Sequence, residues 1–138
     1  LKRAAKWGLD PIIHASSLDE RLSQFQSELE STDRSINDFN VVVWADLRVD
    51  DDRETAKRRY LDSVMGQFAT QFRHQDEDAV IANNWVGTVD DVVGDLMALK
   101  KRGVSRIVVM HTVNETFEEM LQQTRVFAEE VMPRVIHG

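Results

Sequence analysis

The sequence predicts an α/β protein in which parallel strands are connected by helices. Strand-like and helix-like patterns alternate along the chain, and two of the strands are continuous apolar runs, at residues 41–45 and 107–110. Such runs are typical of strands buried on both faces, as in a parallel sheet covered by helices. The alternation indicates right-handed strand-helix-strand connections. At 138 residues the chain is expected to form one domain, residues 1–138.

The first third of the chain predicts a helix end, a short strand and a second helix. Residues 1–7 read as the end of a helix that Gly8 stops, and a short strand follows around residues 12–14. Ser17 and Glu20 have the spacing of a capping box for a helix that extends to about residue 31. Because the chain opens inside a helix and without an initiator methionine, we expect it to be part of a longer protein.

The middle of the chain predicts a strong strand and a long helix. The strand lies within residues 39–49, and residues 50–52, all aspartate, turn the chain and cap the helix. The helix is expected to bury one apolar stripe, formed by Ala56, Tyr60, Leu61, Val64, Met65, Phe68 and Phe72. Residues 75–86 show no clear period, which favours a surface connection over an excursion near a site.

The last third contains the best-defined unit, residues 88–111. Thr88 and Asp91 form a capping box, and Gly103 supplies the residue that ends the helix. The strand at residues 104–110 follows at once. A final helix is expected after His111, capped by Asn114 or Thr112, with Pro133 at its end.

Composition excludes several classes of function. The net charge of −7 and the lack of a basic face argue against general nucleic-acid binding. The absence of cysteine excludes disulfides and thiolate metal sites, and it fits a reducing compartment, so we expect a cytoplasmic protein. No apolar run approaches the roughly 18 residues of a membrane span, so no membrane partner is expected. The four histidines are scattered without metal-ligand spacing, so no metal is expected.

Four segments resemble the C-terminal part of the bacterial luciferase-like monooxygenases, a superfamily of flavin- and F420-dependent oxidoreductases. Residues 1–8 are similar to the helix before the family's sixth strand, and residues 41–53 resemble its seventh strand and the acidic turn after it. Residues 86–92 with 103–109 resemble its Gly-Thr-type helix start and eighth strand, and residues 127–133 resemble its ending.

The resemblance implies a TIM barrel, of which this chain supplies the last three βα units, that is, three parallel strands with flanking helices. It also implies FMN or F420 as the cofactor of the complete enzyme. Because the first five strands and their phosphate-binding turn are missing, we expect the isolated chain to bind neither cofactor and to be inactive. The alternative is a truncated, non-catalytic relative that forms homo-oligomers through its exposed strand edges. An independent flavodoxin-like domain is a third interpretation.

In a TIM barrel the active site lies at the carboxyl ends of the strands. In this chain those ends carry His14, Trp44, Arg48 and His111. Under the resemblance, either histidine is a catalytic candidate, as a hydrogen-bond partner of the flavin or an acid/base group; the alternative is a strand-end histidine with a satisfied hydrogen bond. Trp44 either stacks on the flavin ring or packs in the barrel. Arg48 either binds an anionic group or is solvated.

Overall fold

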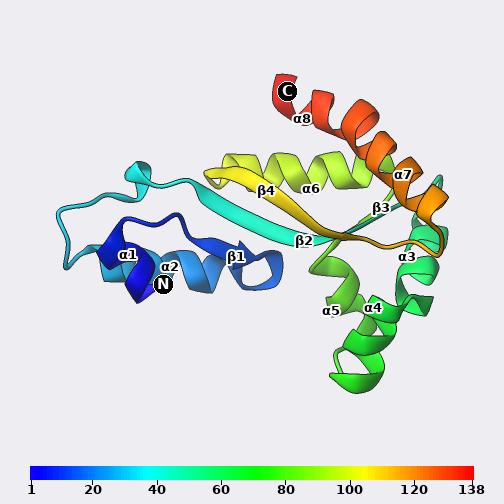
Figure 1. The fold of residues 1–138 in the computed structure, drawn as a ribbon, viewed down its shortest axis with the longest axis horizontal. Helices are drawn as coiled ribbons and strands as arrows, with labels where there is room; N and C mark the ends of the chain where they lie inside the picture. Colours follow the sequence, from blue (N-terminus) through cyan, green and yellow to red (C-terminus); the bar gives the residue numbers. More distant parts are fainter.

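The computed structural model describes residues 1–138 and contains one sheet of parallel strands, with β2 at its centre (Figure 1). β1 and β4 both pair with residues 42–44 of β2 and therefore lie on its opposite edges. β3 pairs with residues 47–49, on the same edge as β1. The strands are β1 (Ile12–His14), β2 (Val41–Val49), β3 (Trp85–Gly87) and β4 (Val104–Thr112).

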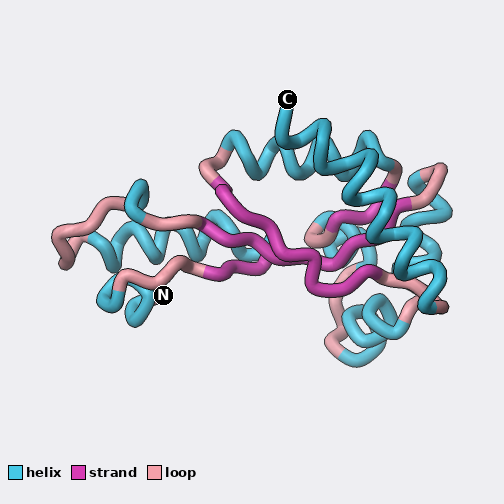
Figure 2. Tube along the Cα trace, turned by 45° about the horizontal axis from the view of Figure 1, so that its top comes forward, coloured by secondary structure: helices cyan, strands magenta, loops and turns pink.

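Helices connect the strands and gather at both ends and along one side of the sheet (Figure 2). The segments between residues 50 and 84 lie near the carboxyl end of β2, and α6 runs alongside β2 and β4 (Figure 1). A π-helical turn at Phe127–Val131 joins the last two helices. The helices are α1 (Lys2–Trp7), α2 (Leu18–Leu29), α3 (Arg53–Asp62), α4 (Val64–Gln67), α5 (Glu77–Ala82), α6 (Val89–Lys101), α7 (Phe117–Val126) and α8 (Met132–His137).

The main core lies on one face of the sheet. Side chains alternate between the faces of a strand, and every second residue of β2, from Val41 to Val49, packs in this core. The apolar stripe of α6 covers them, as the sequence predicts for residues 88–103. The capping box of Thr88 and Asp91 is present, and Gly103 has a positive φ of 83° that favours glycine. The core residues from α6 are Val92, Val93, Leu96 and Leu99.

The other face of the sheet has no helix over its middle (Figure 2). Ile12, Val108 and Met110 are 67%, 41% and 46% exposed. The prediction that residues 107–110 are buried on both faces is therefore wrong, because helices cover only one side of β4. The fold is an open parallel sheet with flanking helices, compatible with part of a TIM barrel, and it has four strands rather than the predicted three.

The long helix predicted after residues 50–52 is broken at Ser63. Asp52 caps α3 and Tyr60 is buried, both as predicted. Ser63 is extended, with a ψ of 164°, and caps the separate helix α4. At Gly66 the backbone comes so close to Tyr60 that a Cβ atom would lie 2.2 Å from the Tyr60 carbonyl oxygen. Only glycine therefore fits at this position. The break leaves three residues of the predicted stripe exposed, namely Val64, Phe68 and Phe72.

Residues 75–86 are not a plain connection, because they form α5 and β3. Asp76 caps α5, but the six residues of the helix and the three of the strand are too few to establish a period. Between α2 and β2, Ile36–Asp38 form a 3₁₀ turn.

Three predicted helix ends are also wrong. The Ser17 hydroxyl donates to the His14 carbonyl oxygen instead of capping α2. Thr116, rather than Asn114 or Thr112, caps α7, because Asn114 instead donates to Thr112. Pro133 lies in the first turn of α8, where its missing N–H costs no helical hydrogen bond, and the helix continues to His137.

None of these helices combines the length and the apolar character needed to cross a membrane.

Candidate functional site

The carboxyl ends of β1 and β4, together with the middle of β2, border a hollow of about 530 Å³. The strands contribute His14 from β1, Trp44 and Asp46 from β2, and Met110 and His111 from β4. Helical segments between residues 60 and 84 close the hollow with both apolar and polar side chains. Three of the four site residues predicted from the sequence, His14, Trp44 and His111, therefore lie together.

Asp46 is the central polar group of this hollow, and it is only 6% exposed. One carboxylate oxygen lies 2.8 Å from Nδ1 of His111, and the other accepts a hydrogen bond of 2.9 Å from the Tyr60 hydroxyl. The Asp46 backbone N–H donates to the Asn84 side chain at 2.9 Å. Asp46 thus connects β2 with α3, with β4 and with the segment before β3.

A bulge in β4 aims His111 at Asp46. Ala45 pairs with Val109 and Leu47 pairs with Thr112, so two residues of β4, Met110 and His111, lie opposite Asp46. Such an extra residue bends the strand and redirects its side chains. His111 is about half exposed, and Nε2 makes no hydrogen bond within the protein.

The hydrogen bonds of Asp46 determine which nitrogen of His111 carries the hydrogen. Burial, with the Asp46 charge adding to it, raises the pKa of Tyr60, so its hydroxyl remains a donor. With the carboxylate accepting at both oxygens, Nδ1 of His111 must be the donor. The neutral ring of His111 therefore has an unprotonated Nε2.

His14 has the opposite arrangement. Its Nδ1 accepts the Ser16 backbone N–H at 3.1 Å and lies 2.6 Å from the Ser16 hydroxyl. Because Nδ1 accepts, the hydrogen of the neutral ring is on Nε2. Burial lowers the pKa of His14, Asp46 opposes this shift and Arg73 adds to it. His14 is thus a neutral N–H donor.

Trp44 pairs with His14 of β1 and with Val108 of β4, so it lies beside His14, whereas His111 lies opposite Asp46. Its ring meets that of His14 edge-on, with 4.3 Å between the ring centroids. Trp44 is partly buried and, like Asp46, lies on the face of β2 opposite the main core. It is thus an aromatic surface of the hollow and not part of the main core.

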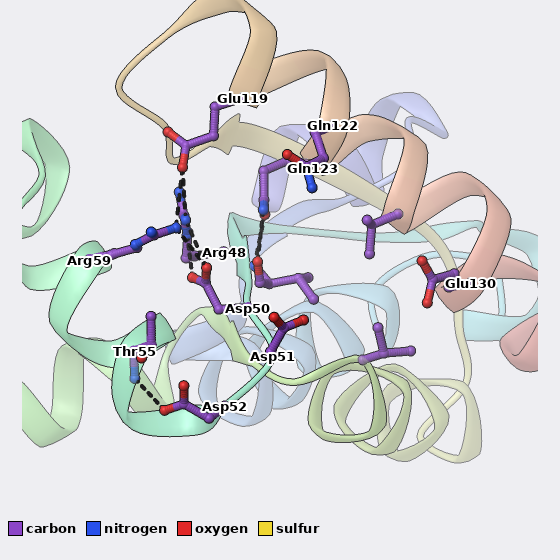
Figure 3. A pocket seen from close by; sticks show the side chains of 13 residues that line it. Arg48, Asp50, Asp51, Asp52, Thr55, Arg59, Glu119, Gln122, Gln123 and Glu130 are labelled. Carbon is purple, nitrogen blue, oxygen red and sulfur yellow. Dashed lines mark hydrogen bonds and ion pairs between the residues drawn. The ribbon is translucent and has the colours of Figure 1, made fainter.

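Arg48 does not line this hollow and lies instead in a different cluster with Asp50 and Glu119 (Figure 3). It is only 2% exposed, so the interpretation of Arg48 as a solvated residue is wrong. It makes a bidentate ion pair with Asp50, at 2.6 and 2.9 Å, and a second ion pair with Glu119 at 2.9 Å. Its remaining nitrogen donates to the Val113 carbonyl oxygen at 2.9 Å. All three nitrogens of Arg48 are thus engaged within the protein.

Gln123 completes this second cluster. Its side-chain amide accepts from the Val49 N–H at 2.8 Å and donates to the Val49 carbonyl oxygen at 2.7 Å. The amide thereby satisfies the last residue of β2 as a neighbouring strand would (Figure 3). The adjoining hollow of about 300 Å³ is lined mainly by polar and acidic side chains, including Asp51 and Glu130.

Sequence reasoning missed Asp46, Tyr60 and Gln123 as site or cluster residues. Asp46 had a usable signal, because it is an acidic residue within a run that is otherwise apolar from Val41 to Leu47. Tyr60 was predicted only as a core residue, and Gln123 lies on a polar helix with no distinguishing pattern.

No family model matches this chain, and a search of curated proteins finds no matching sequence. Among the solved structures that match this chain are two monooxygenases, each aligned with nearly all of it. One is the oxygenating constituent of 3,6-diketocamphane monooxygenase from Pseudomonas putida, a type II Baeyer-Villiger monooxygenase in complex with FMN. It has 14% sequence identity and a TM-score of 0.63, and the match covers 97% of this chain and 45% of the monooxygenase.

The second structure is the monooxygenase RslO1 from Streptomyces bottropensis, with 18% identity and a TM-score of 0.64. The match covers 96% of this chain and 44% of RslO1. The chain shares its fold with part of both monooxygenases. It spans less than half of the length of either one.

The hollow provides groups for a planar ring but few for a phosphate. Trp44 and Phe68 offer aromatic surfaces, and the histidines offer one donor and one acceptor, whereas Arg73 is the only Lys or Arg that lines it. The chain has neither glycine-rich phosphate-loop pattern. No group of three or more His, Asp or Glu side chains is placed to hold a metal ion.

Proposed function

We propose that this chain is the C-terminal part of a luciferase-like, flavin-dependent monooxygenase and contributes one wall of its active site. One observation carries the proposal. The hollow with Trp44, Asp46 and the two histidines lies at the carboxyl ends of β1 and β4, beside the middle of β2. TIM barrels place their active sites at the carboxyl ends of their strands, and the fold is shared with a monooxygenase whose structure is a complex with FMN.

The proposed cofactor of the complete enzyme is FMN or F420. When bound, a reduced flavin activates oxygen, whereas a deazaflavin transfers a hydride. The residues of this chain fit the ring portion of such a cofactor, since Trp44 can stack on it and His14 can donate a hydrogen bond to it. They do not supply a phosphate site, so we expect the 138-residue chain alone to bind neither cofactor stoichiometrically and to be inactive.

The test compares this chain with the longest product of its reading frame. The DNA upstream of the Leu1 codon is sequenced, and both proteins are titrated with FMN and with F420 while cofactor fluorescence is recorded. We expect five further strand-helix units upstream and stoichiometric binding only by the longer product. A stop codon or an unrelated domain upstream, or saturable binding by the 138-residue chain alone, would contradict the proposal.

The second candidate function is a non-catalytic module that forms homo-oligomers. The uncovered sheet face favours it, because Ile12, Val108 and Met110 expose apolar surface beside two strand edges. Light scattering at micromolar concentration tests this proposal. We expect a defined oligomer that a Val108→Lys substitution dissociates, and a monodisperse monomer of the unsubstituted chain would contradict it.

A further inference from the structure

We propose that His111 is a proton-transfer residue and that Asp46 is the positioning residue that keeps its Nε2 available. The inference concerns the hollow at the strand ends. It rests on the proposed function only for the identity of the ligand, which we define by its chemistry: a molecule that presents an acidic O–H or N–H group to His111.

The geometry separates the two ring nitrogens of His111. Nδ1 is held at 2.8 Å by a carboxylate that is itself buried and fixed by Tyr60 and by Asn84. Nε2 lies on the other side of the ring, on a side chain that is about half exposed and lines the hollow. A buried carboxylate behind an exposed imidazole orients the ring and stabilises the imidazolium that forms when Nε2 takes a proton.

The proposed step is a simple proton transfer. The bond between the ligand heteroatom and its hydrogen breaks, its electron pair stays on the ligand, and a new N–H bond forms at Nε2. The positive ring then lies against the Asp46 carboxylate, and the reverse transfer returns the proton to the product. His14 can stabilise the negative charge that develops on such a ligand, because its Nε2 carries a hydrogen.

Charged and titratable groups face His111 from several elements. Asp46 from β2 and His14 from β1 border the same hollow, as do Tyr60 from α3 and Arg73, which follows a second π-helical turn at Phe68–Phe72. A second hollow, on which His111 also borders, adds Arg48, Arg59, Asp62 and Glu115. Of all these groups, only Asp46 forms a hydrogen bond or ion pair with the ring.

The test is a measurement of the histidine tautomers in the 138-residue chain labelled with ¹⁵N, at about pH 8.5, where an ordinary histidine is neutral. A His111→Gln variant identifies the signal. We expect hydrogen on Nδ1 of His111 and on Nε2 of His14. In Asp46→Asn the amide oxygen accepts from Tyr60, so the amide N–H₂ faces Nδ1 and the hydrogen moves to Nε2. Tyr60→Phe removes the other side-chain hydrogen bond of Asp46 but keeps the carboxylate, so the hydrogen should stay on Nδ1 of His111.

A chemical probe tests whether Nε2 is available as a base. Diethyl pyrocarbonate acylates unprotonated ring nitrogens, and peptide mapping by mass spectrometry gives a rate for each histidine. We expect His111 to react faster than His14, and Asp46→Asn to slow His111 several-fold while leaving exposed His137 unchanged. His111 with its hydrogen on Nε2 in the unsubstituted chain, or an unchanged rate in Asp46→Asn, would overturn the inference.

Neither measurement uses a cofactor, so the outcome is independent of the proposed function. If FMN and F420 fail to bind the longer product but His111 has the expected tautomer and reactivity, the flavin proposal fails and the proton-transfer inference stands. If the longer product binds the cofactor but His111 carries its hydrogen on Nε2, the proton-transfer inference fails and the flavin proposal stands. The unsubstituted chain gives the first answer without any variant of Asp46.

Discussion

Two polar clusters lie on the same strand, and they differ in what they leave unbonded. In the cluster around Arg48, every nitrogen of the guanidinium meets a protein oxygen, and Gln123 satisfies the end of β2. In the cluster around Asp46, the buried carboxylate is fully bonded, but the chain of contacts ends at Nε2 of His111, which has no protein partner. Burial and charge are common to both clusters, so the free ring nitrogen is what distinguishes a candidate site from a structural support.

The largest expected effect is the loss of stability in Arg48→Met. Removing the guanidinium leaves Asp50, Glu119 and a carbonyl oxygen without their partner, and breaking a buried pair in this way costs about 3–5 kcal/mol. Urea unfolding measures the change. The control is Arg53→Met, because Arg53 pairs with Asp91 at the surface, where an ion pair contributes about 0–1 kcal/mol. Equal losses in both variants would remove the distinction between a buried support and a surface pair.

A smaller loss of stability is expected for Gln123→Leu. The substitution leaves the Val49 N–H and carbonyl oxygen buried without partners, which costs about 2 kcal/mol. The neighbouring exposed Gln122 is the control, and Gln122→Leu should change the free energy of unfolding by about 0.5 kcal/mol or less. A loss for Gln123→Leu no larger than that of the control would mean that water replaces the amide.

β2 has one face that packs in the main core and one face that carries the candidate site. The sequence predicted the core face more accurately than the site face. Apolar residues at fixed spacing identified the core of β2 and α6, because burial of a regular stripe is a local property of each element. The sequence also predicted that His14 and His111 lie at the carboxyl ends of strands, because a strand end is likewise a local feature of the sequence. The tautomers were not predictable, because they depend on Asp46 and Ser16 and on the bulge that brings β4 into register.

The breaks in the predicted elements have a similar cause. Residues 53–72 have the apolar spacing of one continuous helix. The chain is nevertheless divided into α3 and α4, where Gly66 comes close to the Tyr60 backbone. The spacing of apolar residues does not reveal that contact. The apolar run of β4 predicts burial on both faces, but a strand cannot specify whether a covering element exists. Local patterns thus predicted most of the elements, though not the short α5 and β3, while contacts between elements set the breaks and the exposure.

The smallest expected effect is on the pH dependence of stability, through His14. Its pKa in the folded chain lies below the ordinary value of 6.5, so between these two values the unfolded chain binds more protons. Stability therefore falls as the pH drops below about 6.5 and recovers as the pH rises. In His14→Gln this contribution disappears, so the free energy of unfolding should fall less between pH 7.5 and 5. His137→Gln, at an exposed position, is the control, and identical pH profiles for His14→Gln and the unsubstituted chain would contradict the burial of His14.

The most direct test of the difference between the two clusters is an NMR titration of the longest product of the reading frame with FMN. The ¹⁵N signals of the His14 and His111 rings report on the hollow, and the Nε signal of Arg48 reports on the internal cluster. We expect both histidine signals to shift until FMN saturates, while the Arg48 signal stays in place. If FMN saturates the protein and shifts the Arg48 signal but neither histidine signal, the proposed difference between the two clusters is wrong.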